Sequence, residues 1–411
     1  MEKLHSFGQA AVLILLCLAA LTFPFSVAAC NITLGIAIFL GLVFSMLWQG
    51  FVIAWQQFRP LCIAWLLFYG FMLLSILWSA NPQLGIKVVS HQWFWLLLPL
   101  LLQVLQTEKN RTILMAALST GLALHLEYTV LQSLGYVHVT VAGSFSYAAT
   151  GHIGHTAFGL VYGLWAGWLI HVGIQSQGWK RWVPYLLALW SLVMIFTAHG
   201  RGGYMVAASI LLIITWKDLI IGYGWKRFML AAILLTATFA AFASGPAQER
   251  IEQTLQQIEA MQQGKISASD PRLAIWLGSL EAWKLHPILG TGTGSFTDVT
   301  NIITNSHPEL VYEGGSFAHP HNMYLLAMVR MGIVGLLLLI GFLATWIYIG
   351  WHADWKKNSA GCLITLPVIS IAVHGFTSSS IEEHFSAIIS IAFLAAGLAL
   401  MQQPQDTDIP A

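Results

Sequence analysis

The sequence predicts an all-α integral membrane protein, and three observations support this fold class. Hydrophobic residues make up 57% of the chain and charged residues only 9%, whereas soluble domains carry about 25% charged residues. Apolar runs of about 20 residues, the length that a helix needs to cross a bilayer, recur along the chain. The 18 tryptophans suit the aromatic belts found at membrane–water interfaces.

We expect about twelve transmembrane helices. They are predicted at 9–29, 32–55, 61–79, 85–105, 112–134, 156–175, 183–198, 202–222, 228–244, 322–350, 361–380 and 385–401. The resulting organisation has four parts: spans one to nine in 1–244, a long outer loop in 245–321, spans ten to twelve in 322–401, and a tail in 402–411.

The first span shares features with a cleaved signal peptide, because Val27-Ala28-Ala29-Cys30 fits a lipobox-like cleavage site. Only Lys3 supplies positive charge ahead of the apolar run. We therefore expect this segment to be kept as a membrane span.

Lysines and arginines orient the spans. With the N-terminus in the cytoplasm, eleven of the 18 fall in cytoplasmic segments, as the positive-inside rule requires. These eleven are Lys3, Arg59, Lys109, Arg111, Lys180, Arg181, Lys217, Lys226, Arg227, Lys356 and Lys357. Both termini are then cytoplasmic, and the long loop lies on the outer side.

Charge and cysteine content exclude several other classes of protein. A net charge of +1 offers no surface for a polyanion, so we expect no nucleic-acid partner. The four cysteines lie far apart in apolar runs, without the spacing of a metal site or a disulfide framework.

The outer loop is predicted to hold two helices and a tight turn. Residues 249–262 carry an apolar stripe at helical spacing, which suits either a packing helix or one that guides substrate. A second helix should begin after Asp270, its N-cap, with Pro271 in the first turn, and end before His286-Pro287. The following HPILGTGTGSF predicts a glycine turn, but no strand precedes it, which argues against nucleotide binding.

Two histidines in His319-Pro320-His321-Asn322 directly precede span ten, where water meets the bilayer. A titratable group there can exchange protons with water, although such residues can also simply contact lipid headgroups. Because proline suits a first helical turn, we expect His319 to cap the helix and His321 to lie within it.

Arg201 and Arg272 are both predicted at outer helix N-termini. A cation is unfavourable at that end of a helix unless an anion lies between them. Guanidinium groups suit phosphate oxygens, so the two arginines predict a diphosphate site; contact with lipid phosphates is the alternative. The loop has Asp270 and Asp298 but no Asp-x-Asp pair, so we expect these arginines to act in place of a metal ion.

Other charged residues lie outside these motifs. Lys87 and Arg330 fall within spans, where charge is a functional hint. On a regular helix, however, Arg330 would lie about 180° around and roughly 13 Å below His321, which argues against a shared contact. Glu382-Glu383-His384 predict a solvated outer turn, or one that orients acceptor hydroxyls.

The order of these motifs resembles the O-antigen ligase and polymerase superfamily. It comprises Gly-Arg-Gly-Gly at 200–203, Arg272, HPILGTGTGSF, and the pattern HN-x9-GxxG formed by His321, Asn322, Gly332 and Gly335. The resemblance covers about 190–345. It implies that His321 is the essential histidine and that Arg201 and Arg272 are the essential arginines. One departure is GHIGHTAFG at 151–159, where many members have an Asn-rich turn.

The resemblance implies a metal-independent, inverting glycosyltransferase without a cofactor, in a GT-C-like layout in the bacterial inner membrane. Its donor would be an undecaprenyl-diphosphate-linked glycan and its acceptor the lipid A-core oligosaccharide. His321 would be the general base, and the active site would face the periplasm. We expect His199, His319 and Asn322 to contribute to substrate binding with the arginines.

Three alternatives remain. An O-antigen polymerase would use a second lipid-linked glycan as acceptor, and a protein O-oligosaccharyltransferase would use a serine. A transporter could also have twelve spans, but transporters usually show internal repeats and helices broken near the midplane.

Overall fold

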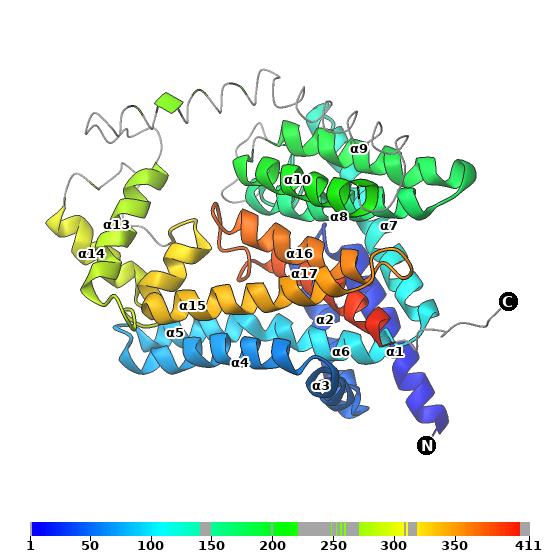
Figure 1. The fold of residues 1–411 in the computed structure, drawn as a ribbon, viewed down its shortest axis with the longest axis horizontal. Helices are drawn as coiled ribbons and strands as arrows, with labels where there is room; N and C mark the ends of the chain where they lie inside the picture. The colour runs from blue at the N-terminus through cyan, green and yellow to red at the C-terminus, as the bar shows by residue number, and fades with distance from the viewer. Residues whose placement is uncertain are drawn as a thin grey trace.

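The computed structural model describes residues 2–139, 149–198, 200–220, 271–307, 310 and 319–402, together with 248, 252, 255, 256 and 259. Every regular element within these ranges is a helix (Figure 1). The predicted ninth span at 228–244 lies outside the described residues, as does nearly all of the predicted helix at 249–262.

The N-terminal part contains long apolar helices and short 3₁₀ segments that continue them. They are α1 (Glu2–Thr22), α2 (Val27–Val43), α3 (Met46–Gln57), α4 (Arg59–Leu74) with η1 (Ser75–Trp78), α5 (Pro82–Ser90) with η2 (His91–Leu96) and α6 (Leu97–Val104), and α7 (Glu108–Ser133).

The remaining helices complete the bundle and add two helices at one end of it. They are α8 (His155–Gln175), η3 (Gly178–Arg181), α9 (Trp182–Thr197), α10 (Arg201–Ile214) with the π-helical η4 (Thr215–Ile220), α13 (Pro271–Leu285), α14 (Phe296–Ser306), α15 (Met323–His352), α16 (Ala360–His374) and α17 (His384–Met401).

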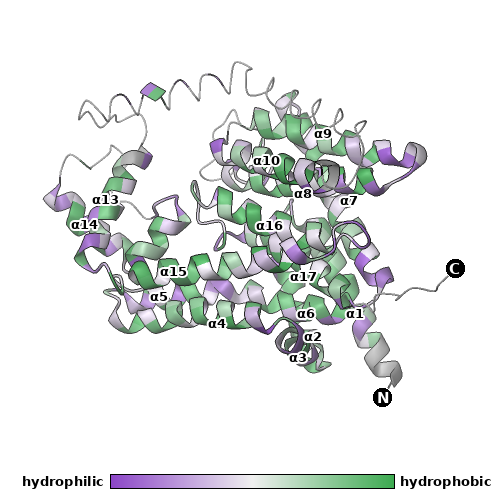
Figure 2. Ribbon diagram, in the orientation of Figure 1, coloured by the Kyte–Doolittle hydropathy of each residue, from purple (hydrophilic) through white to green (hydrophobic). Residues whose placement is uncertain are grey.

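Six helical segments of the described chain are long and apolar enough to cross a membrane. They are Arg59–Trp78, Pro82–Val104, Glu108–Ser133, His155–Gln175, Met323–His352 and His384–Met401. Large apolar side chains on them stay exposed, including Leu67 at 55% and Leu337 at 61%. Figure 2 shows hydrophobic residues along the lengths of α4, α15 and α16. Such surfaces suit contact with lipid rather than water, so the chain is an integral membrane protein.

The predicted span at 32–55 is wrong as a single helix. Its residues form α2 and α3, which meet at an angle of 83°. Ser45 between them has φ of 60°, a left-handed conformation that ends the hydrogen-bond ladder of α2. Hydropathy alone did not reveal the bend because the apolar residues continue through it.

Helices α13 and α14 form a small second core with the start of α15. Helix α13 has the predicted bounds, whereas α14 was not predicted. Figure 1 shows both at one end of the molecule, beside the first turns of α15. The buried members of this core are Ala274, Ile275, Ala282, Phe296, Val299, Ile303, Leu310, Leu326 and Val329. The core fixes α13 against α15.

Helix α15 is broken at Gly332, where φ is 65° and ψ is −163°. The backbone N–H groups of Ile333 and Val334 donate to the carbonyls of Pro287 and Ile288, at 2.9 and 3.3 Å. In return, the N–H groups of the next loop residues donate to the carbonyls of Val329 and Arg330, at 2.8 and 2.9 Å; the donors are Thr291 and Gly292. The loop therefore satisfies the backbone groups that the break would otherwise leave unpaired.

The predicted glycine turn is confirmed, and its geometry explains its composition. Gly290, Gly292 and Gly294 all have positive φ, at 72°, 93° and 105°. A Cβ on Gly290 would lie 2.4 Å from the backbone of α15, and one on Gly294 would lie 2.4 Å from the backbone of Gly85 in α5. The turn thus fits between two helices at distances that only glycine permits.

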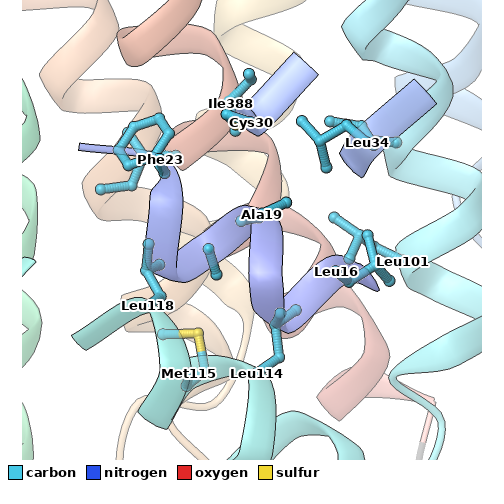
Figure 3. Close-up of a pocket in the computed structure, with 14 residues that line it drawn as sticks. Leu16, Ala19, Phe23, Cys30, Leu34, Leu101, Leu114, Met115, Leu118 and Ile388 are labelled. Atoms are coloured by element: carbon cyan, nitrogen blue, oxygen red, sulfur yellow. The ribbon is translucent and has the colours of Figure 1, made fainter. Parts of the chain in front are cut away.

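Cavities within the bundle are apolar. The one in Figure 3, of about 40 Å³, is lined by α1, α2, α6, α7 and α17, with Leu16, Ala19, Cys30 and Leu114 among its residues. A larger cavity of about 560 Å³ lies against α3, α4 and α6. Neither contains the predicted site residues.

Candidate functional site

The His-Pro-His-Asn turn differs from its predicted register. Asn322, not His319, is the N-cap of α15, since its Oδ1 accepts the N–H groups of Tyr324 and Leu325, both at 3.0 Å. His321 lies before the helix, with φ of 48°. The prediction assumed that Pro320 would open the helix, but a side-chain cap two residues later satisfies the first free N–H groups instead.

His319 is held by hydrogen bonds at both ring nitrogens. Its Nδ1 accepts the backbone N–H of His321 at 2.9 Å, and its Nε2 lies 2.6 Å from Ser379 Oγ. Burial, reinforced by the nearby charges of His321 and Arg330, lowers the pKa of His319 from 6.5 to about 3. His319 is therefore neutral at physiological pH, which leaves it without the charge of an imidazolium.

The His321 ring is the accessible one of the pair. The residue is exposed, and among the described residues none hydrogen-bonds to its ring. Partial desolvation by surrounding protein lowers the pKa of His321, the Arg272 charge lowers it further, and the Glu383 charge opposes them. A neutral imidazole that faces solvent can accept a proton from a hydroxyl group.

Helix α13 brings Arg272 to the same turn. Trp276, one helical turn beyond Arg272, donates from Nε1 to the carbonyl of Pro320 at 3.0 Å. Residues four apart share a helix face, so this bond places the Arg272 face of α13 against the His-Pro-His-Asn turn. The predicted N-cap, Asp270, lies outside the described residues.

Arg201 is the first residue of α10, as predicted, and this helix end adjoins the turn after α16. A Cβ on Gly202 would lie 2.3 Å from Thr377 Oγ1 and 2.8 Å from His374 Cδ2. The same turn accepts the N–H of Met323 through the carbonyl of Gly375, at 2.7 Å. The turn thus connects the starts of α10 and α15. His199 lies outside the described residues.

The expectation that Glu382-Glu383 form a merely solvated turn is wrong, because Arg330 pairs with this turn. Arg330 is buried, and its Nη1 lies 2.9 and 3.0 Å from the two carboxylate oxygens of Glu382. Glu383 accepts hydrogen bonds from Ser378 and Ser386. The turn is therefore held by specific pairs rather than merely solvated. The turn also reaches the histidines, because Ser379 Oγ lies 2.6 Å from His319 Nε2 and the Glu383 charge raises the pKa of His321.

Sequence reasoning missed Ser379, His374 and the connection through Glu382. The available signal was chemical: a buried arginine in a span needs an acidic partner, and Glu382 is the first residue of the acidic pair that precedes α17. His374 is fully buried at the end of α16 and contacts the carbonyl of Thr156 and the hydroxyl of Ser380, both at 2.7 Å. The sequence did not indicate these contacts, because His374 lies within an apolar run.

The geometry brings together an exposed neutral histidine and a cationic side chain. His321 can accept a proton, and Arg272 can stabilise negative charge nearby. Arg201 occupies a helix N-terminus, an environment that favours anions. Within the described ranges, no three His, Cys, Asp or Glu side chains are grouped to hold a metal ion.

Fold and site together define a helical membrane protein with a histidine–arginine site at one end of its bundle. Residues 186–340 match the family model described as O-Antigen ligase, from α9 through the break in α15. This match confirms the resemblance to the O-antigen ligase superfamily, whose members are glycosyltransferase-like membrane enzymes that use lipid-linked glycans. No curated protein matches the chain.

Proposed function

We propose that this protein is an O-antigen ligase that transfers a glycan from undecaprenyl diphosphate to lipid A-core oligosaccharide. The observation that carries the proposal is the exposed, neutral His321 beside Arg272 at one end of the membrane bundle, within the part of the chain that matches the family. Outside the cytoplasm no nucleotide sugar is available, so the bond energy must come from the donor's own diphosphate linkage.

The proposed step is a direct displacement at the anomeric carbon. An acceptor hydroxyl oxygen forms the new glycosidic bond, the bond between that carbon and the diphosphate oxygen breaks, and lipid diphosphate leaves. His321 accepts the hydroxyl proton, a role worth about 10²–10⁴-fold in rate. A single displacement inverts the configuration, since no carboxylate is proposed as a covalent nucleophile.

Arg201 and Arg272 are proposed to bind the diphosphate and to stabilise the charge that grows on it. In this account they replace a metal ion, so transfer should survive excess EDTA. His199 and Asn322 complete the proposed binding residues, whereas His319, expected from sequence to bind substrate, uses both ring nitrogens for hydrogen bonds within the protein. Asn322 acts there at least partly through the helix cap, because its Oδ1 is occupied by two backbone N–H groups.

We further propose twelve spans in the bacterial inner membrane, with both termini cytoplasmic. Spans one to nine then occupy 1–244, the periplasmic loop 245–321, spans ten to twelve 322–401, and the tail 402–411. The distribution of Lys and Arg supports this orientation, and it places the histidine–arginine site on the periplasmic side.

A reconstituted reaction with different acceptors tests the proposal. Purified protein and lipid-diphosphate-linked glycan are mixed with lipid A-core, with a second lipid-linked glycan, or with a serine-containing acceptor protein. We expect product only with lipid A-core, with and without EDTA. Extension of the lipid-linked glycan would instead identify a polymerase, and glycosylated serine a protein O-oligosaccharyltransferase. Movement of intact glycolipid without any new bond would favour a transporter.

A further inference from the structure

The two histidines of the turn have different environments although they are two positions apart. Their ring centroids lie 5.2 Å apart at an angle of 63°. The His321 ring faces outward, whereas the His319 ring points back and accepts the backbone N–H of His321 at 2.9 Å. His319 therefore contacts the backbone of the proposed base, and not its ring nitrogens.

This contact determines which nitrogen of His319 carries the proton. A neutral imidazole has one N–H and one acceptor nitrogen. Nδ1 accepts from the His321 backbone, so the proton resides on Nε2, which donates to Ser379 Oγ at 2.6 Å. Protonation of Nδ1 would abolish the backbone contact, and burial disfavours that charged state.

The backbone of His321 needs such a contact. Its φ of 48° lies in the left-handed region, which is uncommon for residues other than glycine. Asn322, the usual kind of side chain to stabilise a turn, is already used to cap α15. An Asx-turn forms when a side-chain oxygen accepts the N–H two residues on, and His319 makes the equivalent bond with Nδ1.

Ser379, which accepts the hydrogen bond from His319 Nε2, is itself held in place. The backbone N–H of Glu382 donates to the carbonyl of Ser379 at 2.8 Å, and the Glu382 carboxylate pairs with Arg330 in the broken segment of α15. The Arg330–Glu382 pair thus ties the turn that carries Ser379 to the same helix that begins after His321.

We propose that His319 is a positioning residue that holds His321 in its left-handed conformation and so sets the direction of the proposed base. This inference rests on the proposed function for its effect on transfer. The bond itself, from His321 N–H to His319 Nδ1, does not depend on that function and can be measured separately. Here His319 acts as a hydrogen-bond acceptor, not as a proton carrier or a substrate ligand.

The discriminating variants differ in whether they keep an acceptor for the His321 N–H. Asparagine at 319 can form a true Asx-turn with the same N–H, whereas leucine has similar bulk and no acceptor. We expect His319→Asn to retain kcat close to that of the native protein. His319→Leu should lose about 10²-fold in kcat, the usual cost of misplacing a catalytic group by about 1 Å. KM for the lipid-linked donor should be unchanged in both.

Amide hydrogen–deuterium exchange of the segment containing 319–323 supplies a readout independent of transfer. The His321 amide should exchange slowly in the native protein and in His319→Asn, and faster in His319→Leu. The acidic limb of the kcat–pH profile should stay unchanged in His319→Asn, since His321 remains the titrating group. Thermal unfolding of each variant in the same detergent identifies any general loss of structure.

Two results would overturn the inference. Equal exchange and equal kcat in the Asn and Leu variants would show that the acceptor at 319 is not needed. A kcat in His319→Asn as low as in His319→Leu, with a slow His321 amide in the Asn variant, would show that the imidazole itself acts on substrate. If the native protein transfers no glycan to any acceptor, the proposed function fails, while the exchange comparison still tests the role of His319.

Discussion

At the scale of single residues, His321 combines an exposed ring with a backbone that is fixed on both sides. Its N–H is bound by His319, the preceding carbonyl by Trp276, and the next side chain caps α15. The proposed role as proton acceptor requires such a fixed backbone, because the ring must be held in position to meet the acceptor hydroxyl group.

The sign of the His321 pKa shift gives a prediction for the dependence of transfer on pH. His321 must be neutral to act as a base, and its pKa is lowered below 6.5. We therefore expect kcat/KM to fall with decreasing pH only below 6.5. Glu383 raises this pKa, so Glu383→Gln should move the acidic limb to lower pH.

Glu382→Gln is the matched control for this pH measurement, because Glu382 pairs with Arg330, whereas Glu383 is the carboxylate that raises the His321 pKa. It should leave the position of the acidic limb unchanged, whatever its effect on the rate. If the acidic limb of the kcat/KM–pH profile of the native protein has its midpoint at or above pH 6.5, the assignment of His321 as the titrating base is contradicted.

The proposed diphosphate contacts predict different results for alanine and lysine at the arginine positions. Replacement of Arg201 or Arg272 by alanine should reduce transfer severely while the protein remains folded. Lysine keeps the charge but loses the planar fork that binds two phosphate oxygens, so rescue should be partial. Transfer rates and thermal unfolding of the four variants test this. Full activity with lysine at both positions would mean that a point charge suffices.

The residue types of the site could be predicted from sequence, but their contacts could not. Histidines and arginines near span ends are visible as local patterns. The His319–Ser379 and Arg330–Glu382 contacts join positions 60 and 52 residues apart, and nothing local specifies them. The left-handed backbone of His321 could not be predicted either, because Pro320 fits the first turn of a helix. The sequence therefore did not identify Asn322 as the N-cap of α15.

At the scale of elements, the break in α15 and the glycine turn form one unit. The sequence shows them as two motifs 40 residues apart, each of them weak evidence alone. The backbone hydrogen bonds between 287–292 and 329–334 explain why glycines occur in both. A helix prediction from hydropathy continues through Gly332, because the residues around it are apolar on either side.

Gly332 and Gly341 give a matched test of this unit, since both lie in α15. A Cβ on Gly332 would lie 2.1 Å from the carbonyl oxygen of Ile288 at a positive φ, whereas one on Gly341 meets nothing within 4 Å. We expect Gly332→Ala to destabilise the protein by at least about 1–3 kcal/mol, and Gly341→Ala to be nearly neutral. Thermal unfolding in detergent measures both. Similar midpoints for the two variants would contradict the packing described.

At the scale of the whole molecule, the apolar helices follow from bilayer physics, and the sequence predicted some of them more closely than others. The predicted span at 9–29 is shifted by seven residues from α1, and the predicted span at 361–380 runs six residues past the end of α16. The bounds of α8, α9 and α17 differ from the predicted ones by one residue at each end, or less. The bend between α2 and α3 was not predicted, because hydropathy indicates which residues contact lipid but not the direction of the helix axis. The proposed orientation depends on charge counts alone.

Labelling of single cysteines tests that orientation, with the native cysteines replaced. Lys284 at the end of α13 and Lys357 after α15 are both exposed, and the proposed orientation puts them on opposite sides of the membrane. A membrane-impermeant maleimide should label Lys284→Cys in intact spheroplasts and Lys357→Cys only after permeabilisation. The reverse pattern would place the histidine–arginine site in the cytoplasm.

The most direct test of the central claim is glycan transfer by His321→Ala, measured beside the native protein with lipid-diphosphate-linked glycan and lipid A-core. We expect the native protein to join the two, and the variant to lose nearly all transfer while it still binds the lipid diphosphate through its arginines. Transfer at the native rate by His321→Ala, with the protein folded and the donor bound, would contradict the account.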